Sequence, residues 1–332
     1  MEIGKALILA GSHGPDERPY AAAPSRPRHL FPVANRPILF HQLEALRAAG
    51  VQRATILSDV ASVESIAAAV GDGGDWRLSV RHAVYDPGAG LRGALTAGGD
   101  FFDGEPVLVQ HGDALLEPIQ SHLVAFAQEE LDALALRLPA RADAARSAPA
   151  PAPAYVLSPR AIEILRGGGT GDGENPVDGV RAGGGRVGIR PIEGCLACHG
   201  DIEALLESNR RILEQLRGAP GVQPAGVRIQ GAVEIHPTAV VRRSVLRGPL
   251  VIGPGARISD AYIGPSTSIG AGVEIEAAEI EHSIVLPEAS LRFVGTRIES
   301  SVIGRRARIG RSFEPPGALR LAVGEGAEVV LA

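Results

Sequence analysis

Residues 251–275 read "VIGPGARISDAYIGPSTSIGAGVEI", and in this stretch an isoleucine recurs every five or six residues. The recurring residues are Ile252, Ile258, Ile263, Ile269 and Ile275. This period is typical of the hexapeptide repeat of a β-helix, in which the aliphatic side chain points into a narrow core and small residues allow the sharp corners. The count resumes at Ile303-Gly304 and Ile309-Gly310, so the pattern predicts a β-helix over residues 226–332.

The two ends of a β-helix expose rows of backbone N–H and C=O groups, which must be capped or paired. Association between copies is one way to pair them, so we expect a homo-oligomer. Immediately upstream, residues 201–225 are predicted to form a connecting amphipathic helix and a linker. The apolar residues on one side of that helix are Ile202, Leu205, Leu206, Ile212, Leu213 and Leu216.

The first 200 residues alternate between short apolar runs and helical patterns, which predicts an α/β domain. Residues 6–9, 54–57 and 106–109 have the composition of buried strands, and residues 37–50 have helical apolar spacing that ends at a glycine. We expect a parallel sheet covered by helices. Ligands on such sheets bind at the carboxyl ends of the strands, where Gly11 and the Gly112-Asp113 pair fall.

A tract rich in proline and alanine interrupts this domain at residues 138–154, "LPARADAARSAPAPAPA". Its composition is typical of an extended surface connector and argues against a sheet strand. Residues 167–185 are rich in glycine. We therefore expect residues 138–190 to be a degenerate or flexible part of the first domain.

The overall composition is that of a globular protein of about two domains, with 332 residues, 45% hydrophobic and 21% charged. The formal net charge of -5 argues against nucleic acid or an anionic membrane as a main partner. No stretch has the length of a membrane span and residues 1–10 lack the pattern of a secretion signal, so we expect a cytoplasmic protein. Two cysteines are too few for a disulfide framework.

Several stretches of the chain resemble one known family. They are "KALILAG", "FPVANRPILFHQLEALRAAGV", "HGD", "SNRRIL", the repeat quoted above, "EHSIVL", "SVIGR" and "LAVGEGAEV". Together they resemble the long form of the glucose-1-phosphate thymidylyltransferases, from near the N-terminus to the C-terminus except around residues 138–190. The resemblance implies a Rossmann-like nucleotidyltransferase domain of the GT-A-like kind, followed by a left-handed β-helix. It also implies Mg²⁺ as cofactor and a nucleoside triphosphate and a sugar 1-phosphate as substrates, joined with release of pyrophosphate.

The family's glycine-rich phosphate turn corresponds to residues 11–19, "GSHGPDERP". The resemblance implies nucleotide contacts from Leu9, Ala10, Gly11 and Gly14, and a phosphate contact from Arg18. Two other positions depart from the family, because Pro15 and Asp16 replace a threonine and an arginine. Proline lacks an N–H donor, and an aspartate repels phosphate.

Three further family positions carry the remaining substrate contacts. Arg28 stands where the family has a lysine that contacts the sugar phosphate, with a solvated loop cation as the alternative. Gly90 lies on the nucleotide loop, and Tyr85 replaces a glutamine that reads the base, although a phenol cannot offer the paired donor and acceptor of an amide.

Only one of the family's two metal-binding positions has a carboxylate in this sequence. Gly112 and Asp113 match the family's magnesium-binding aspartate segment, with a helix-capping role for Asp113 as the alternative. Cys198 stands at the second metal carboxylate, and a thiol is a poor ligand for magnesium. The family's sugar-binding Glu-x-Lys-Pro segment has no match.

Two short features of the sequence are typical of other kinds of chemistry. "CLACH", residues 195–199, fits a haem-attachment pattern, but haem attachment needs export and a zinc site would need further ligands; buried thiols are the plainer interpretation. Many hexapeptide-repeat proteins are acyltransferases, and His236 and His282 lie in the repeat region; we interpret both as surface or corner residues.

The changes in the phosphate turn, the base reader, the second metal position and the sugar segment all weaken nucleotidyl transfer. We therefore expect a catalytically impaired homologue that acts as a regulatory or scaffold partner of an active paralogue or a biosynthetic enzyme. The alternative is an active enzyme for an atypical sugar or cyclitol phosphate, with Arg28, Arg18 and Asp113 as its catalytic residues and Asp113 as its metal ligand.

Overall fold

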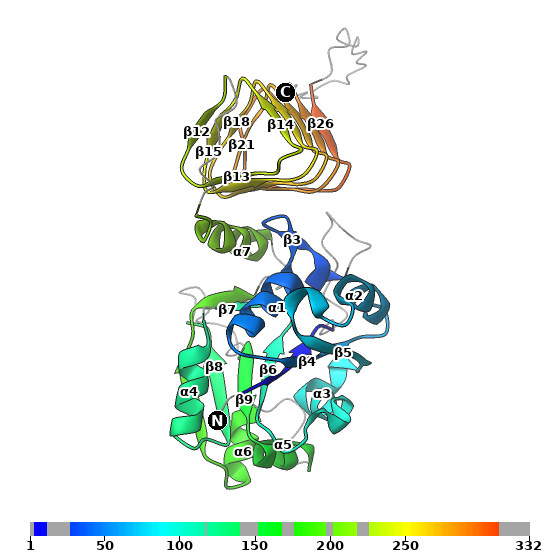
Figure 1. Ribbon diagram of the computed structural model, residues 1–332, viewed down its shortest axis with the longest axis vertical. Coiled ribbons are helices and arrows are strands. Elements are labelled where there is room, and N and C mark those ends of the chain that lie inside the picture. The colour runs from blue at the N-terminus through cyan, green and yellow to red at the C-terminus, as the bar shows by residue number, and fades with distance from the viewer. Residues whose placement is uncertain are drawn as a thin grey trace, which may run out of the picture.

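A seven-stranded sheet, in the order β10-β8-β9-β6-β1-β4-β5, is the centre of the first part of the chain (Figure 1). The computed structural model describes residues 3–11, 27–116, 118–139, 152–167, 176–196, 202–217 and 226–311. The strands of the sheet are β1 (Lys5–Leu9), β4 (Arg53–Ser58), β5 (Ser79–Val84), β6 (Val107–His111), β8 (Ala133–Arg137), β9 (Ala154–Leu157) and β10 (Val187–Pro191).

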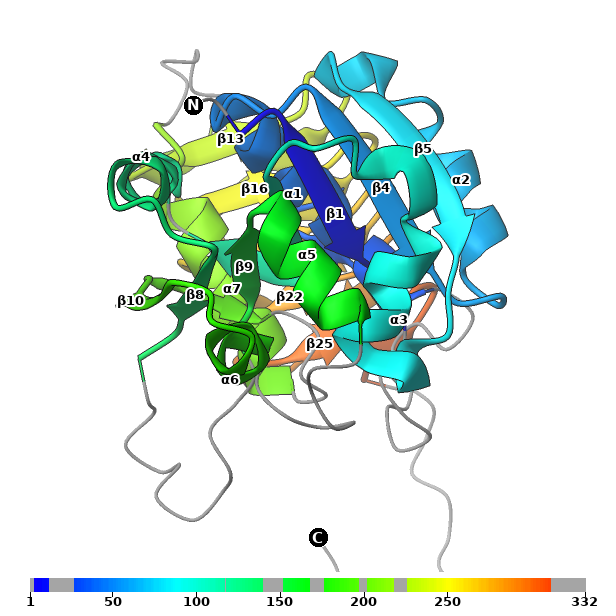
Figure 2. The same cartoon turned by 90° about the horizontal axis from the view of Figure 1, so that it is seen from below.

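Helices cover both faces of this sheet, and the side chains of β1 alternate between the two faces. Ala6 and Ile8 pack in one hydrophobic cluster and Leu7 and Leu9 in another. Helices of the first cluster are α1 (Ile38–Ala48), α2 (Val63–Val70) and α4 (Gln120–Gln128). Helices of the second are α3 (Gly90–Ala97), α5 (Pro159–Arg166) and α6 (Pro176–Ala182), which lie in front of the sheet in Figure 2. The result is a three-layer α/β arrangement.

Short elements connect these layers. Four 3-10 helices are η1 (Arg28–Leu30), η2 (Gly74–Trp76), η3 (Pro87–Ala89) and η4 (Gly99–Phe101). Two antiparallel strand pairs are β2 (Pro32–Val33) with β3 (Arg36–Pro37), and β7 (Ala114–Leu116) with β11 (Gly194–Leu196). The strands and the helix expected at residues 6–9, 54–57, 106–109 and 37–50 correspond to β1, β4, β6 and α1.

The segment around residues 138–190 differs from its expectation. The sheet is mixed rather than parallel, because β9 runs antiparallel to both β6 and β8. The first residue of β9, Ala154, belongs to the proline-alanine tract, for which the composition predicted no strand. Ala152 is buried, and the Pro153 carbonyl accepts a hydrogen bond from the His111 N–H at 3.0 Å. The described part of this segment therefore forms regular elements, from β9 to β10.

Three five-stranded parallel sheets form the C-terminal part, in repeated coils that make a left-handed β-helix (Figure 1). The strands of the first sheet are β12 (Arg228–Gln230), β15 (Val245–Arg247), β18 (Tyr262–Ile263), β21 (Glu279–Glu281) and β24 (Ile298–Glu299). Those of the second are β13 (Val233–Ile235), β16 (Leu250–Ile252), β19 (Thr267–Ile269), β22 (Ile284–Val285) and β25 (Val302–Ile303). Those of the third are β14 (Val240–Arg242), β17 (Arg257–Ser259), β20 (Glu274–Glu276), β23 (Ser290–Arg292) and β26 (Arg308–Gly310).

The isoleucines of the repeat occupy the interior of these coils, as predicted. Ile252 pairs in register with Ile269, and Ile269 pairs with Val285, so aliphatic side chains stack from coil to coil. All five isoleucines of residues 251–275 are buried in one cluster. Ile309 is the exception, because it lies in the last described strand and is 39% exposed.

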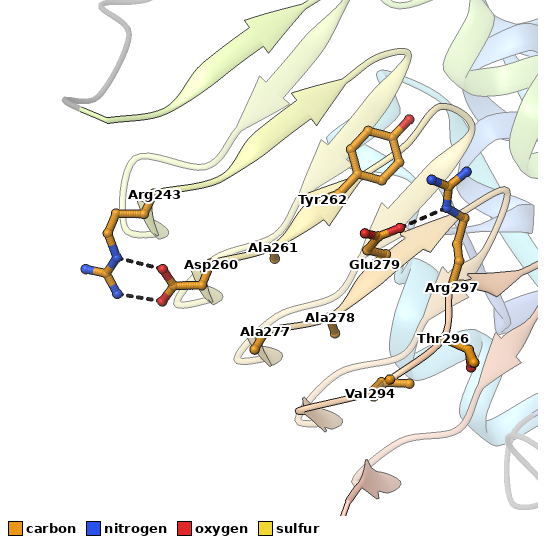
Figure 3. Close-up of a pocket in the computed structure, with 11 residues that line it drawn as sticks. Arg243, Asp260, Ala261, Tyr262, Ala277, Ala278, Glu279, Val294, Thr296 and Arg297 are labelled. Atoms are coloured by element: carbon orange, nitrogen blue, oxygen red, sulfur yellow. Dashed lines mark hydrogen bonds and ion pairs between the residues drawn. The ribbon is translucent and has the colours of Figure 1, made fainter.

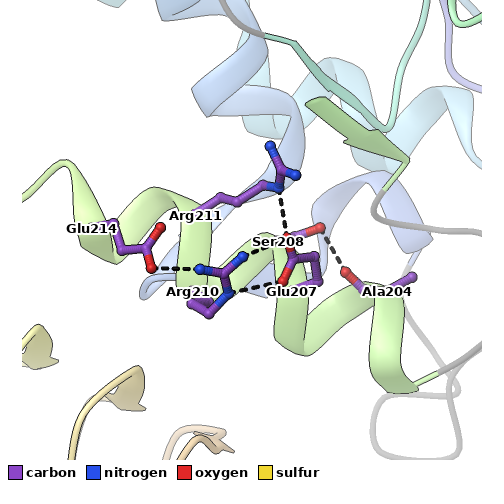
Figure 4. Close-up of polar contacts among 6 residues, drawn as sticks. All are labelled: Ala204, Glu207, Ser208, Arg210, Arg211 and Glu214. Carbon is purple, nitrogen blue, oxygen red and sulfur yellow. Dashed lines mark hydrogen bonds and ion pairs between the residues drawn. The ribbon is translucent and has the colours of Figure 1, made fainter. Parts of the chain in front are cut away.

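Helix α7 (Ile202–Glu214) lies between the sheet domain and the β-helix (Figure 1). Ion pairs line its surface side: Glu207 binds both Arg210 and Arg211, and Arg210 also binds Glu214 (Figure 4). Burial alone would raise the pKa of Glu207, but hydrogen bonds from the two guanidinium groups hold that pKa below its usual value. The opposite side of α7 contacts both domains.

Within the described ranges, no helix has both the length and the apolar composition needed to cross a bilayer.

Candidate functional site

The carboxyl ends of β1, β4 and β6 bring together several of the residues singled out above. The three strands are parallel neighbours, and Leu9 lies in register with Leu57 on one side and His111 on the other. The Ala10 N–H donates to the Leu57 carbonyl and the Gly112 N–H donates to the Leu9 carbonyl, each at 2.7 Å. The residues that follow these strands therefore meet at one edge of the sheet, as expected for a ligand site of this fold.

Gly112 is closely surrounded at this edge. A Cβ atom on Gly112 would lie 2.8 Å from Cδ2 of His29, 2.9 Å from the Leu9 oxygen and 3.1 Å from Cα of Ala10. Two of these neighbours are backbone atoms that cannot move aside easily, so only glycine fits. The contact with His29 also brings η1, which begins at Arg28, beside the Gly112-Asp113 pair.

His29 was not recognised from the sequence as a site residue. Its side chain is only 4% exposed, and nothing in the sequence links it to Gly112, because the two residues are far apart in the chain. The neighbouring Arg28 is half-buried at the start of η1.

Asp113 is 8% exposed and lies two residues after the end of β6. One or two carboxylates usually bind Mg²⁺ in nucleotide sites, with phosphate and water oxygens completing the coordination. Asp113 fits the role of one such ligand. Among the described residues, however, there is no group of three or more histidine, cysteine, aspartate or glutamate side chains that could hold a metal. The fit to magnesium is therefore partial, and it rests on Asp113 alone.

Tyr85, at the predicted base-reading position, packs against Gly11. A Cβ on Gly11 would lie 3.0 Å from the Tyr85 ring and 2.6 Å from Cγ of Pro87. Tyr85 is 7% exposed, and its N–H donates to the Ser58 carbonyl at 3.0 Å. The tyrosine and the proline thus cover the Cα of Gly11, and only a residue without a side chain can lie beneath them.

Burial and two carboxylates control the ionisation of this tyrosine. Burial, and then the negative charges of Asp59 and Asp86, raise the pKa of Tyr85 to about 12. The phenol therefore stays protonated at physiological pH.

Asp59 and Asp86 are acidic residues at this edge that sequence reasoning did not identify. The Asp59 carboxylate accepts hydrogen bonds from the N–H and the hydroxyl of Ser62, at 2.9 and 3.2 Å. Asp86 accepts the Gly88 N–H at 2.9 Å and caps η3. The position of Asp59 directly after β4 was the available signal, since that strand ends at the same edge. Both carboxylates add negative charge near Gly11.

Three predicted residues remain: Gly90, Gly14 and Arg18. Gly90 begins α3 with a φ of 58°, and a Cβ added to it would meet no atom within 4 Å, so it lies open to solvent. Gly14 and Arg18 lie outside the described residues, as do the substitutions at Pro15, Asp16 and Cys198. The structure thus brings together Leu9, Ala10, Gly11, Tyr85, Gly112 and Asp113, with Arg28 on the adjoining turn.

The two histidines of the repeat region lie as interpreted. His236 is exposed and bonds to Thr238 of its own coil at 2.9 Å. His282 has a φ of 46°, the left-handed conformation of a coil corner.

A hollow lies on the outer surface of the β-helix, with a volume of about 550 Å³ (Figure 3). Alanines line its floor, and charged residues stand at its two ends. Arg243 forms a bidentate pair with Asp260, at 2.7 and 2.6 Å, and Arg297 binds Glu279 at 3.1 Å. The charged side chains that line the hollow therefore satisfy each other, unlike those of a site built for an anionic substrate. We assign the candidate site to the sheet edge.

Known proteins are similar to this chain over most of its length. Residues 5–146 match the family model described as nucleotidyl transferase. A glucose-1-phosphate thymidylyltransferase of Streptomyces griseus is 31% identical over 97% of this chain and 98% of its own length. The low-salt glycan biosynthesis nucleotidyltransferase Agl11 of Haloferax volcanii is 29% identical over 98% of this chain and 100% of its own.

A solved structure supports the fold over about two-thirds of the chain. It is a Bacillus anthracis protein assigned as a glucose-1-phosphate thymidylyltransferase, and it covers 65% of this chain and 97% of its own, with a TM-score of 0.54 and 17% identity. At that identity the likeness concerns the fold alone. The near-complete coverage of the Streptomyces protein shows more: the chain belongs to the sugar nucleotidyltransferase family that includes the glucose-1-phosphate thymidylyltransferases.

Proposed function

We propose that this chain is a sugar nucleotidyltransferase homologue with impaired catalysis, which acts in the cytoplasm as a regulatory or scaffold partner of an active paralogue or a biosynthetic enzyme. The packing of Tyr85 against Gly11 is the observation on which the proposal rests. At that position the family resemblance implies a glutamine, whose amide offers a base one donor and one acceptor. The buried phenol of Tyr85, with its raised pKa, has only a hydroxyl to offer.

The charge around Gly11 supports the same proposal. Asp59 and Asp86 follow strands β4 and β5, which end at this edge. A nucleoside triphosphate is highly anionic, and its transfer reaction depends on positioning and on neutralising charge. Local hydrogen bonds hold Asp59 and the exposed Asp86, and both carboxylates lie close enough to Tyr85 to raise its pKa. In addition, the sequence places Asp16 where the family has an arginine.

Active transfer to an atypical sugar or cyclitol phosphate is the second candidate, and the position of Asp113 favours it. In that reaction a phosphate oxygen of the sugar phosphate bonds to the α-phosphorus of the nucleotide, and the bond from that phosphorus to the pyrophosphate oxygen breaks. Arg28 would contact the sugar phosphate and Arg18 the triphosphate. Asp113 would be one ligand of Mg²⁺, which neutralises phosphate charge when bound.

A pyrophosphate-release assay separates the two candidates. The purified protein is tested with each common nucleoside triphosphate, a panel of sugar and cyclitol phosphates, and Mg²⁺. We expect turnover far below the ordinary range, which begins at about 1 s⁻¹. Turnover at or above that value, lost in Asp113→Ala, would establish the enzyme and contradict the proposal. Turnover that persists in Asp113→Ala would instead come from a contaminant.

Binding measured by calorimetry tests the role of Tyr85 itself. Tyr85→Gln restores the family's amide at the base-reading position. We expect this variant to bind a nucleoside triphosphate more tightly than the original chain does, but to remain slow, because the substitutions at Pro15, Asp16 and Cys198 are still present. If Tyr85→Gln alone produced ordinary turnover, impairment would reside in one residue, and the wider proposal would fail.

A further inference from the structure

Asn209, at the middle of α7, is fully buried and bonds to two other parts of the chain. Its side-chain oxygen accepts the Ala34 N–H at 2.9 Å and the Ser268 hydroxyl at 2.6 Å. Its side-chain NH₂ donates to the Ser266 carbonyl at 2.9 Å. A backbone N–H can only donate and a carbonyl can only accept, so these partners determine the orientation of the amide.

These partners belong to both domains. Ala34 lies in the turn of the β2–β3 hairpin, in the sheet domain, whereas Ser266 and Ser268 lie on the coil that contains β19. A second bond follows the same route, because the NH₂ group of Asn35 donates to the Ile269 carbonyl at 2.7 Å. Each bond is between groups that are partly or fully removed from water, where an unmade hydrogen bond is costly.

The hairpin turn requires this support from outside. Ala34 and Asn35 have φ angles of 47° and 63°, as the tight two-residue turn between antiparallel strands demands. The left-handed conformation is unfavourable for a residue with a Cβ such as alanine. The bond from the Ala34 N–H to Asn209 compensates for that cost, so the conformation of the turn depends on α7.

Apolar packing joins the same three parts. Phe31, Val33 and Ile38 from the hairpin region form one buried cluster with Leu205 of α7. Ile284 and Leu286 of the β-helix complete it. Because this cluster excludes water, the Asn209 amide has no ready substitute for its protein partners.

The hairpin continues directly into the candidate site. The Ile38 N–H donates to the Phe31 carbonyl and the Phe31 N–H donates to the Arg28 carbonyl, both at 3.0 Å. The turn so closed holds His29 against Gly112. A continuous series of contacts thus runs from the β-helix through Asn209 and the hairpin to the segment that carries Arg28.

We infer that Asn209 is a positioning residue through which the β-helix sets the conformation of residues 28–37, at the edge of the candidate site. The inference goes beyond the proposed function, and it holds whether or not the site turns over. It assigns the β-helix a role in shaping the site in addition to any role in association.

Amide hydrogen exchange of the full chain tests this inference without requiring activity. In Asn209→Ala the Ala34 N–H and the Ser266 carbonyl lose their partner. We expect exchange at residues 33–36 and at Phe31 to become about tenfold faster or more. Arg210→Ala is the matched control, since the Arg210 side chain lies on the same helix but is 41% exposed and pairs with Glu207 and Glu214 of that helix.

Three results would overturn the inference. Unchanged exchange in Asn209→Ala would show that the amide does not hold the hairpin. Equal acceleration in Arg210→Ala would show that the hairpin depends on the stability of α7 rather than on Asn209. Faster exchange confined to residues 33–36, with Phe31 unchanged, would show that the effect stops short of the site. If Asn209→Ala does not fold, Ser268→Ala takes its place, because it removes only the bond from the Ser268 hydroxyl to Asn209. Hydrogen exchange at the same amides is then measured in that variant.

A conservative variant provides a signature that a packing defect would not produce. In Asn209→Asp, a protonated carboxyl can still accept from Ala34 and donate to the Ser266 carbonyl, whereas the ionised form cannot donate. Burial raises the pKa of such a carboxyl above its value in the unfolded chain, about 3.9, so the folded form with the bond is favoured at low pH. We expect this variant to protect the hairpin better at pH 5 than at pH 8, relative to the original chain at each pH. Protection independent of pH would contradict the role of the donated bond.

Discussion

The β-helix and the carboxyl edge of the first sheet differ in how many types of amino acid each position tolerates. In the β-helix, an aliphatic residue such as Ile252 stacks on Ile269 and then on Val285, so any apolar side chain of similar size serves. At the sheet edge, Gly11, Gly112 and Tyr85 each meet a different set of neighbours. Repetition therefore lets the β-helix tolerate change, whereas the site is altered by single substitutions.

The largest expected effect tests the coil interior. Ile269→Ala removes a fully buried side chain and should lower the free energy of unfolding by about 2–5 kcal/mol, measured by denaturant titration followed by circular dichroism. Ile309→Ala is the matched control, because Ile309 is 39% exposed, and it should cost less than about 1 kcal/mol. Similar losses in the two variants would mean that the stacking of the interior does not decide stability.

A smaller effect is expected at the sheet edge. Gly112→Ala places a methyl group against the Leu9 oxygen and Cα of Ala10, and the resulting overpacking should cost about 1–3 kcal/mol. The same variant should weaken any nucleotide binding measured by calorimetry, because the ends of β1 and β6 must move apart to admit the methyl group. Gly4→Ala meets no atom within 4 Å and is the control. If both substitutions were neutral, the close approach of β1 and β6 would not constrain this position.

The dependence of stability on pH tests the burial of Tyr85. The pKa of Tyr85 is about 12 in the folded chain, against about 10 when unfolded, so the hydroxyl is protonated in both states below pH 10. Above pH 10 the unfolded chain ionises first, and stability is lost as the pH approaches 12. At pH 11 the loss due to this group is about 1.4 kcal/mol, and Tyr85→Phe should lack it. Denaturant titrations from pH 9 to 11 measure the difference; parallel curves for the two proteins would show that the phenol is open to water.

The smallest effect is expected on the surface of α7. Arg210→Ala removes ion pairs with Glu207 and Glu214 at the partly exposed surface of α7, and it should change the free energy of unfolding by no more than about 1 kcal/mol. Thermal denaturation at low and high salt measures it. A much larger loss would show that the solvent side of α7, as well as its buried side, supports the connection between the domains.

The fold was largely predictable from local patterns. The apolar runs at residues 6–9 and 54–57 and the helical spacing at 37–50 correspond to β1, β4 and α1, because each pattern reflects burial of one element. Strand β9 was missed because it is only four residues long and begins inside the proline-alanine tract. Its antiparallel direction depends on where the preceding segment returns to the sheet, which no local pattern records.

The candidate site was only partly predictable. The positions of Gly11, Gly112 and Asp113 followed from their place after strands, since parallel strands end at the same edge. The contacts of His29 with Gly112 and of Tyr85 with Gly11 were not foreseen, because each joins residues distant in the chain. Asp59 and Asp86 were overlooked because an acidic residue after a strand is usually solvated.

By itself, the sequence determined the β-helix and the placement of the glycines at the strand ends, since the spacing of apolar and small residues depends on the geometry of a single element. Only the tertiary structure decided that Asn209 joins the β-helix to the β2–β3 hairpin and that Tyr85 covers Gly11. Hydrogen bonds and contacts of this kind arise between segments that are brought together by packing, and their partners cannot be identified from the spacing of either segment alone.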